Sequence, residues 1–453
     1  MLRFLFFILA VLPAAGLAQE VISNRQRDIV FRSVHVIPMD RERVLTNQTV
    51  VVRNGRITAM GNDGSVKVAP GALIIDAAGK YLTPGWAEMH AHVPPIDNLE
   101  PMKEVLTLYL ANGITTIRGM LGHPRHLELR RMINAGDVLG PHFYATGPSF
   151  NGQTVKTAGR GAEMVREQKA AGYDYLKLHP GLTKETFPAI ARTAQEVGIP
   201  FVGHVSFNVG VWRAIDARYS SIDHLDGFIE AITPGSDTLA EPETGLFGSW
   251  IAWQADAARI PKLVRALRDK KIRVVPTQAL AERWLSPKPA EAFTADPEMK
   301  YMKPQDVQNW VNAKTSYTSN PNFSKEHAEK LIDIRRKLIY ACQKNGVELL
   351  LGSDAPQIFN VPGFSIHHEM KYMVDAGLTP YETLRTGTVN VASYLNKPDS
   401  GVIKTGNVSD LVLLSGNPLA DINQTHNIEG VMIGTNWVSK AYIQQALKKL
   451  EKQ

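Results

Sequence analysis

The feature that most constrains this chain is a long middle region in which short apolar segments alternate with amphipathic ones. The amphipathic segments include TFPAIARTAQEVG and IPKLVRALRDKK, whose apolar residues recur at helical spacing. Strands that alternate with helices favour a parallel α/β fold, and eight such units predict a TIM-like (β/α)8 barrel. The eight candidate strands lie around His90 and at Ile114–Arg118, His142–Thr146, Tyr173–Leu178, Phe201–His204, Ser221–His224, Ile272–Thr277 and Glu348–Asp354.

Both ends of the chain have the pattern of short strands joined by turns. Two strand-like runs flank the pair Asn54-Gly55, which is a strong hairpin signal. The stretch from 400 to 439 has the same texture, so strands from the two ends can complete one sheet that neither end would stabilise alone. We therefore expect a discontinuous β-sandwich domain, built from residues 19–84 and 397–453, beside a barrel at 85–396.

The first residues have the features of a secretory signal. Arg3 precedes the apolar run Phe4–Leu12, which is too short to span a bilayer, and Gly16-Leu17-Ala18 fits a small-x-small cleavage pattern. We expect residues 1–18 to be removed near Ala18 and the mature chain to be exported, either periplasmic or secreted. A membrane anchor or a buried first strand is the alternative. No later apolar segment is long enough to span a membrane, so stable membrane insertion is not expected.

Composition narrows the class of partner. The formal net charge is +6 and the pI is about 9.1, but lysines and arginines are scattered among acids, which gives nucleic-acid binding little support. The single cysteine, Cys342, excludes an intramolecular disulfide and lies in a helical pattern that favours a buried thiol. The sequence leaves the oligomeric state open, and a homo-oligomer is compatible with it.

Side chains capable of chemistry stand at the ends of several predicted strands. His90 and His92 end the first strand, and side chains two apart in a strand share a face, so both imidazoles project into one space. A barrel gathers the carboxyl ends of its strands at one face. Nitrogen and oxygen ligands of this kind suit a divalent metal. The later strands end in Lys177, His204, His224 and Asp354.

Taken in order, these six residues resemble the metal-ligand set of the amidohydrolase superfamily. The resemblance is to its two-metal, carboxylated-lysine type, and it is closest to the imidazolonepropionase-like and Xaa-Pro dipeptidase-like branch. The phrases NGITTIRG and TPYETLRTGTVNVASYL support it. Two positions depart from the family pattern: Gly119 stands where relatives commonly have an acid, and Asp223 precedes His224 where relatives usually have glutamate.

The resemblance implies a role for each residue. His90 and His92 would bind one metal together with Asp354, and His204 and His224 would bind the second. Lys177 would react with carbon dioxide to give a bridging carbamate. Asp354 would accept the proton of a metal-bridging hydroxide, and the metal held by His224 would polarise the scissile carbonyl, so these two residues are the implied catalytic pair. Zinc suits the ligands, with manganese, iron or cobalt as alternatives.

The implied activity is that of an exported, metal-dependent amidohydrolase. Its expected substrate is a small molecule with an amide bond, of the dipeptide or N-acyl amino acid type. The same centre would serve a lactone, carbamate or phosphotriester hydrolase. The alternative from another class is a non-catalytic binding or scaffold protein on an inherited fold. The presence of all six candidate ligands counts against a scaffold, which has no chemical need for them.

Three further residues are candidates for contact with substrate. His142 and Tyr144 stand two apart on the third strand, where they would either face substrate or pack inside the barrel. His179 follows Lys177 by two residues, and we favour a loop or supporting role for it. The insertion at 279–323 has no single period and would serve either as a lid over the site or as a plain surface excursion.

Overall fold

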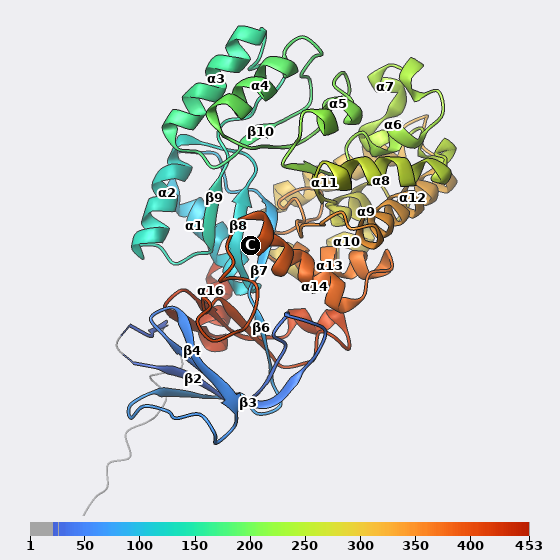
Figure 1. Cartoon of the computed structure of the whole chain (residues 1–453). Coiled ribbons are helices and arrows are strands. Elements are labelled where there is room, and N and C mark those ends of the chain that lie inside the picture. The colour runs from blue at the N-terminus through green and yellow to red at the C-terminus, as the bar shows by residue number, and fades with distance from the viewer. Residues whose placement is uncertain (1–20, 26, 453) are drawn as a thin grey trace, which may run out of the picture.

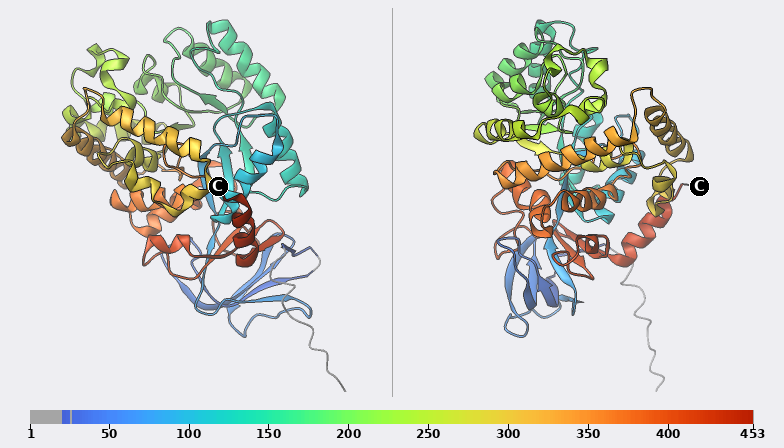
Figure 2. Two further views of the ribbon diagram at one scale, coloured as in Figure 1. Left: turned by 180° about the vertical axis from the view of Figure 1, so that it is seen from behind. Right: turned by 90° about the vertical axis from the view of Figure 1, so that its right-hand side faces the viewer.

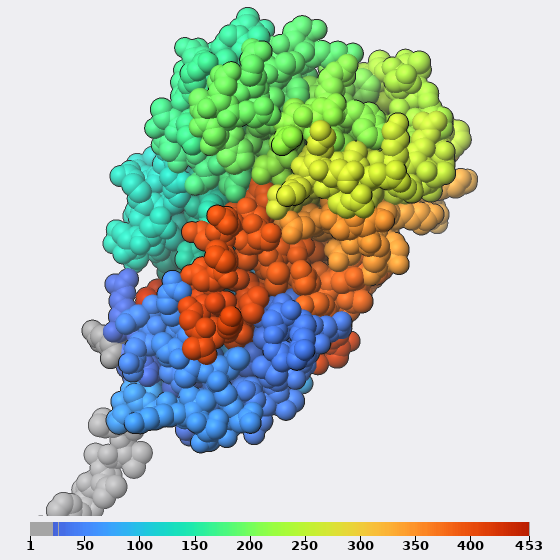
Figure 3. Space-filling model, in the orientation of Figure 1, coloured from blue at the N-terminus to red at the C-terminus, as the bar shows by residue number. Residues whose placement is uncertain are grey.

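The computed structural model describes residues 21–25 and 27–452, and the signal expected at 1–18 lies outside them. The described chain forms an α/β body with a β-rich lobe at one end, seen at the bottom of each view (Figures 1 and 2). The C-terminal segments, orange to red, lie directly against the blue N-terminal strands (Figure 3). No helix in the described part of the chain combines the length and apolarity needed to cross a membrane.

Parallel strands form the centre of the α/β body. They belong to two sheets with the orders β7-β8-β9 and β10-β11-β12-β13. A parallel bridge between Thr146 and Tyr175 joins the two sheets, and the Met89 amide donates to the Leu351 carbonyl at 2.8 Å. This arrangement is TIM-barrel-like. The strands are β7 (Trp86–Ala91), β8 (Ile114–Gly119), β9 (His142–Ala145), β10 (Leu176–Leu178), β11 (Phe201–Gly203), β12 (Ser221–Asp223) and β13 (Arg273–Val275).

The eighth strand expected at 348–354 does not form as a regular strand. The segment contributes an isolated parallel bridge between Val274 and Leu349. Beyond it the backbone leaves the extended conformation, and Asp354 has a φ of 64°. Gly352 passes so close to β7 that an added Cβ would lie 2.9 Å from the amide nitrogen of His90. The segment nevertheless bonds to both neighbours, because Leu350 donates to the Val274 carbonyl and Met89 donates to the Leu351 carbonyl. The closed eight-stranded barrel stays a prediction.

Amphipathic helices cover these strands, as the sequence predicts. In α8 the residues Ile260, Leu263, Val264 and Leu267 recur at helical spacing, and all four are buried. The two predicted helical segments are confirmed as α4 and α8. The helices that follow the strands are α1 (Leu99–Ala111), α2 (Pro124–Ala135), α3 (Ala158–Ala171), α4 (Phe187–Val197), α5 (Val211–Asp216), α6 (Phe228–Ile232), α8 (Ile260–Asp269), α12 (Lys325–Lys344), α13 (Ser365–Asp375), α14 (Pro380–Gly387) and α15 (Val389–Tyr394).

The two ends of the chain share one sheet, which has nine strands within the described residues. Its central contact is the antiparallel pairing of β6 with β14, which joins Leu82 to Leu413. The predicted hairpin is confirmed, with Asn54 and Gly55 both at positive φ between β3 and β4. The expected two-layer sandwich stays a prediction. The strands are β1 (Ile22–Ser23), β2 (Ile29–Val36), β3 (Leu45–Arg53), β4 (Arg56–Asn62), β5 (Leu73–Asp76), β6 (Tyr81–Pro84), β14 (Leu411–Leu414), β15 (Ile428–Ile433) and β16 (Asn436–Ser439).

The insertion at 279–323 is largely helical and packs on a core of its own. Phe293, Tyr301 and Trp310 are buried there against Phe359 and Val361. Its elements are α9 (Gln278–Trp284), α10 (Glu291–Thr294), η6 (Pro297–Tyr301) and α11 (Pro304–Thr318). Near the C-terminus the chain also forms η7 (Ile422–His426) and α16 (Lys440–Leu450).

Candidate metal centre

The six predicted ligands lie at the carboxyl ends of the central strands. His90 is in β7 and His92 follows its last residue, while Lys177 is in the three-residue strand β10. His204 and His224 come directly after β11 and β12. Asp354 follows the bridged segment at Leu349. Strand ends that lie far apart in the sequence thereby supply one group of side chains.

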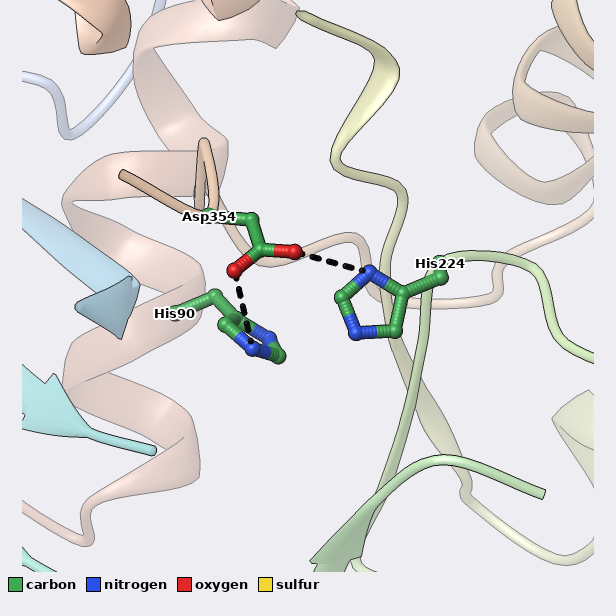
Figure 4. Close-up of side chains that lie close together, drawn as sticks. All are labelled: His90, His224 and Asp354. Carbon is green, nitrogen blue, oxygen red and sulfur yellow. Dashed lines mark ion pairs between the residues drawn. The ribbon is translucent and has the colours of Figure 1, made fainter. Parts of the chain in front are cut away.

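The Asp354 carboxylate lies among three imidazoles. Its Oδ1 atom is 2.7 Å from Nε2 of His92 and 3.5 Å from Nε2 of His90. Its Oδ2 atom is 3.5 Å from Nδ1 of His224 (Figure 4). Ligand atoms of His90, His224 and Asp354 all lie within 4.8 Å of one another, a spacing at which one cation can contact them together.

Lys177 and His204 complete the group on its other side. The Nζ atom of Lys177 lies 3.3 Å from Nε2 of His90. The His204 ring stacks on His224 with 4.2 Å between centroids. Its Nδ1 atom donates to Oδ2 of Asp226 at 2.7 Å, which leaves Nε2 as the unprotonated nitrogen. The structure therefore brings all six predicted residues into one cluster.

Burial favours the neutral imidazoles of His90, His204 and His224 and makes the Lys177 ammonium easier to deprotonate. Desolvation is the largest cause that lowers the pKa of His90, His204 and His224 well below the ordinary value, and the nearby Lys177 adds to it. Desolvation also lowers the pKa of Lys177 to about 8. Neutral imidazoles have a lone pair for a cation. A lysine with this pKa has an accessible neutral amine, which is the form that reacts with carbon dioxide.

One buried atom tests whether the residues fit a metal. Nε2 of His224 has no hydrogen-bond partner in the part of the chain that the structure describes. Its other nitrogen, Nδ1, lies 2.9 Å from Oγ1 of Thr277, and in the tautomer in which Nδ1 donates to that hydroxyl, Nε2 has a free lone pair. An unpaired buried acceptor costs about 1–3 kcal/mol. A divalent cation would satisfy this atom, and the imidazole and carboxylate donors suit one.

Further buried groups orient the ligands. Nδ1 of His90 donates to Oδ2 of Asp223 at 2.8 Å, and Asp223 is also paired with Arg118. Glu88 accepts a hydrogen bond from the His90 amide at 2.9 Å, and burial raises its pKa to about 7. The departure at Asp223 noted from the sequence therefore leaves an acid that supports a ligand directly. Such contacts hold the ligand rings in place.

Sequence reasoning missed Glu88 and Asp226. Glu88 lies two residues before His90, so strand alternation would have placed it on the same face. Asp226 reaches His204 because the backbone turns sharply after β12, where His224 and Leu225 have φ values of 64° and 59°. Left-handed backbone at non-glycine residues stores strain, and it gathers at functional sites.

The structure places the three candidates for substrate contact in two different regions. His179 lies beside the cluster, 5.1 Å from the His204 ring, and burial lowers its pKa to about 2. His142 and Tyr144 are not brought to the cluster. His142 opens β9 and lies 3.0 Å from Asp410, and both candidates line a separate cavity. His142 stands at the amino end of β9, whereas the predicted ligands lie at the carboxyl ends of their strands, and a substrate contact of these two residues stays a prediction.

A cleft of about 790 Å³ adjoins the cluster and includes His204 and Asp226 in its wall. The segment between β12 and α8 supplies much of its lining, with Glu230 and Phe247 among the residues. No residue of the insertion at 279–323 lines it, so a lid role for the insertion receives no support. The segment between β12 and α8 contains η2 (Ser236–Thr238), α7 (Glu241–Thr244), η3 (Leu246–Gly248), η4 (Ala252–Gln254) and η5 (Ala257–Arg259).

A second group of possible ligands consists of Asp296, Glu298 and His368. Arg283 forms an ion pair with Asp296, and His368 lies 2.6 Å from Glu298. These partners already compensate the acids, so this group makes a weaker metal site than the central cluster.

Comparisons with known proteins agree with this geometry. A family model described as the amidohydrolase family matches residues 81–438. The imidazolonepropionase of Idiomarina loihiensis is 22% identical over 395 residues, which cover 84% of this chain and 88% of that protein. A solved Xaa-Pro dipeptidase with bound methionine aligns with a TM-score of 0.67 and 18% identity, covering 91% of this chain and all of the other. This last likeness shows the fold.

Other relatives match over a smaller part. The enamidase of Eubacterium barkeri is 40% identical over 174 residues, which are 36% of this chain and 38% of the enamidase. The adenine deaminase of Rubrobacter xylanophilus is 27% identical over 274 residues, which are 55% of this chain and 44% of the deaminase. The matches thus span less than half the length of these two curated relatives.

Proposed function

We propose a hydrolytic function from one premise: this chain belongs to the amidohydrolase family. Membership makes it a hydrolase of carbon–nitrogen bonds that uses divalent metal. Within that class we propose that it cleaves an amide bond in a small molecule of the dipeptide or N-acyl amino acid type. We also propose that the mature chain is exported, on the sequence of residues 1–18.

The observation that carries the proposal is the placement of the Asp354 carboxylate among the His90, His92 and His224 imidazoles. His90, His92 and Asp354 would hold one ion, and His204 and His224 a second, with Lys177 between them as its carbamate. Bound divalent ions supply an activated water and an electrophile for the scissile carbonyl.

The chain's own residues perform the remaining tasks. Asp354 lies at the centre of the cluster, so its carboxylate is the group placed to accept a proton and return it to the leaving nitrogen. Asp223 accepts the proton on Nδ1 of His90, so Nε2 of His90 faces Lys177 and Asp354 unprotonated. Asp226 fixes His204 in the same way. These two rings are thus set in one tautomer before substrate binds, and Thr277 holds the His224 ring through its contact with Nδ1.

A comparison of two buried lysines tests the proposal. Metal analysis of the purified protein should find about two divalent ions per chain, and Lys177→Ala should lower both metal content and amide hydrolysis. Lys314→Ala is the matched control, because Lys314 is also buried, also has its pKa lowered to about 8, and lies outside the cluster. Unchanged metal content in the Lys177 variant would reject the two-metal centre.

A substrate screen separates the alternatives. Xaa-Pro dipeptides, N-acyl amino acids, lactones, carbamates and organophosphates would be tested on the metal-loaded protein. We expect turnover of an amide. Turnover of a lactone, carbamate or phosphotriester alone would move the function to that class, and bound metal without any turnover would favour a scaffold.

A further inference from the structure

Glu230 occupies an unusual position in the wall of the cleft beside the metal centre. It belongs to the one-turn helix α6, in which Phe228, Ile229 and Ile232 are fully buried. Those three residues pack into the core, and the remaining two, Glu230 and Ala231, line the cleft together with His204 and Asp226. The fold therefore places a carboxylate in the same cleft as a predicted metal ligand.

One oxygen of the Glu230 carboxylate is not satisfied by the protein, although the backbone N–H of Glu230 donates to the carboxylate. Its Oε2 atom is buried and has no hydrogen-bond partner within the described residues. The nearby Ser236 hydroxyl donates at 2.6 Å to the Glu230 backbone carbonyl and not to the side chain. Burial is the largest cause that raises the pKa of Glu230 to about 7, and the charge of Asp226 adds to it. A buried carboxylate oxygen without a partner is costly, and a charged donor satisfies it best.

Three of the four lysine and arginine side chains of the same cleft are engaged elsewhere. Arg259 is 3.6 Å from Asp256, Lys262 lies 5.2 Å from the centre of the Trp212 ring, and Arg213 donates to the Val209 carbonyl at 3.1 Å. The fourth is Lys184, and no ion pair joins any of the four to Glu230 in the described chain. A ligand cation can then pair with Glu230 in place of a proton.

Apolar surface lies in the same cleft. Leu246 and Trp212 line it and are 39% and 38% exposed, values high for such large apolar side chains. Phe247 also lines it and stacks on His224 with 5.5 Å between ring centroids. Apolar walls beside a carboxylate match a ligand whose cation stands at the end of an apolar stem.

We propose that this cleft selects amide substrates that carry an ammonium or guanidinium group, and that Glu230 recognises that group. The inference rests on the proposed function, because it names the substrate class of the same site. Glu230 is then a specificity-determining residue: it binds the cation while the scissile bond lies at the cluster around Asp354.

Paired substrates test the inference. Nα-acetyl-lysine and Nα-acetyl-norleucine have similar stems and differ in the terminal ammonium of lysine. For the hydrolysis of each acetyl amide, kcat/KM would be measured on the metal-loaded wild type and on Glu230→Gln. We expect the wild type to prefer the lysine amide and the variant to lose about 10- to 100-fold on it alone, as a hydrogen bond to a charged group implies. Glu196→Gln is the control and should keep the preference, because Glu196 lies outside the cleft and its side chain is 54% exposed.

Calorimetry without turnover gives a second readout. Pentylamine, which has the ammonium and the apolar stem but no amide bond, should bind the wild type more tightly than pentanol, and Glu230→Gln should remove the difference while keeping the metal content. An unchanged lysine-to-norleucine ratio in the variant would overturn the role of Glu230. Hydrolysis of the norleucine amide alone would overturn the selectivity but leave the amidohydrolase proposal intact. If neither amide were hydrolysed, the binding difference would still decide the inference, whereas the metal analysis would decide the function.

Discussion

Nδ1 of His90 lies 2.8 Å from Oδ2 of Asp223, and both side chains are fully buried. The contact fixes the imidazole so that Nε2 faces Lys177 at 3.3 Å and Asp354 at 3.5 Å. Arg118 lies 3.4 Å from the same Asp223 carboxylate, which keeps a compensating charge beside it. A carboxylate on the far side of a ligand imidazole raises its basicity and sets its tautomer.

Asp223→Asn should therefore weaken metal binding while leaving every predicted ligand in place. We expect metal affinity to fall about 10- to 100-fold, measured by competition with a chromogenic chelator. Asp174→Asn is the control, because Asp174 also pairs with an arginine, Arg130, but lies outside the cluster. Equal metal affinity in the two variants would contradict the role of Asp223.

The second prediction concerns Gly203, which packs on the stem of Lys177. Gly203 has a φ of 111°, and an added Cβ would lie 2.7 Å from the Leu178 carbonyl oxygen and 2.8 Å from Cδ of Lys177. Gly203→Ala should displace Lys177 and lower the metal content. Gly172→Ala is the matched control, since Gly172 also has a positive φ but an added Cβ there meets nothing within 4 Å. Both variants should lose thermal stability, and only the first should lose metal.

The strand ends were the part of the site that sequence could predict. Alternation along β7 places His90 and His92, and the carboxyl ends of successive strands place Lys177, His204 and His224. Asp226 could not be found this way, because its contact with His204 depends on left-handed backbone at His224 and Leu225. Local periodicity does not encode such a turn.

Two expected features differ in detail for local physical reasons. The segment at 348–354 bonds to Val274 and Met89, but the left-handed backbone of Asp354 ends its extended conformation. His142 has strand spacing with Tyr144, but it opens β9 and contacts Asp410 from the β-rich lobe. The sequence pattern locates these strands. It does not show which residues stand at the carboxyl end of a strand, because that depends on where pairing begins.

Metal removal should lower the Tm of the protein, and this change should depend on the residues of the predicted metal cluster. A ligand that binds the folded state adds about 2.7 kcal/mol at a hundred times its dissociation constant, so a chelator should lower the Tm and added zinc should restore it. His92→Ala should make both Tm responses smaller, because His92 is one of the three residues that would hold one of the two ions and contacts Asp354. His142→Ala should respond like the wild type, since His142 lies outside the cluster. A Tm that the chelator leaves unchanged in the wild type would contradict a bound metal.

The last prediction concerns pH and uses Glu369, a fully buried residue of α13 outside the predicted ligands. One oxygen accepts from the Ala279 amide at 2.6 Å, and the other has no partner within the described chain. Burial raises its pKa to about 8 from an ordinary value of 4.5. Between these two pH values the unfolded chain has lost the proton and the folded chain retains it, so folding stability from this group falls as pH rises.

Glu369→Gln removes that titration while keeping an acceptor for the Ala279 amide. The Tm of the metal-free wild type, relative to this variant, should fall from pH 4.5 to pH 8 and level off above it, as measured by calorimetry across that range. Metal-free protein is used because metal binding has its own pH dependence. Glu326→Gln, at a glutamate whose side chain is 74% exposed, should show no such trend. A Tm difference that stays constant across the range would mean that Glu369 is ionised in the folded protein, with Arg335 as the nearby positive charge.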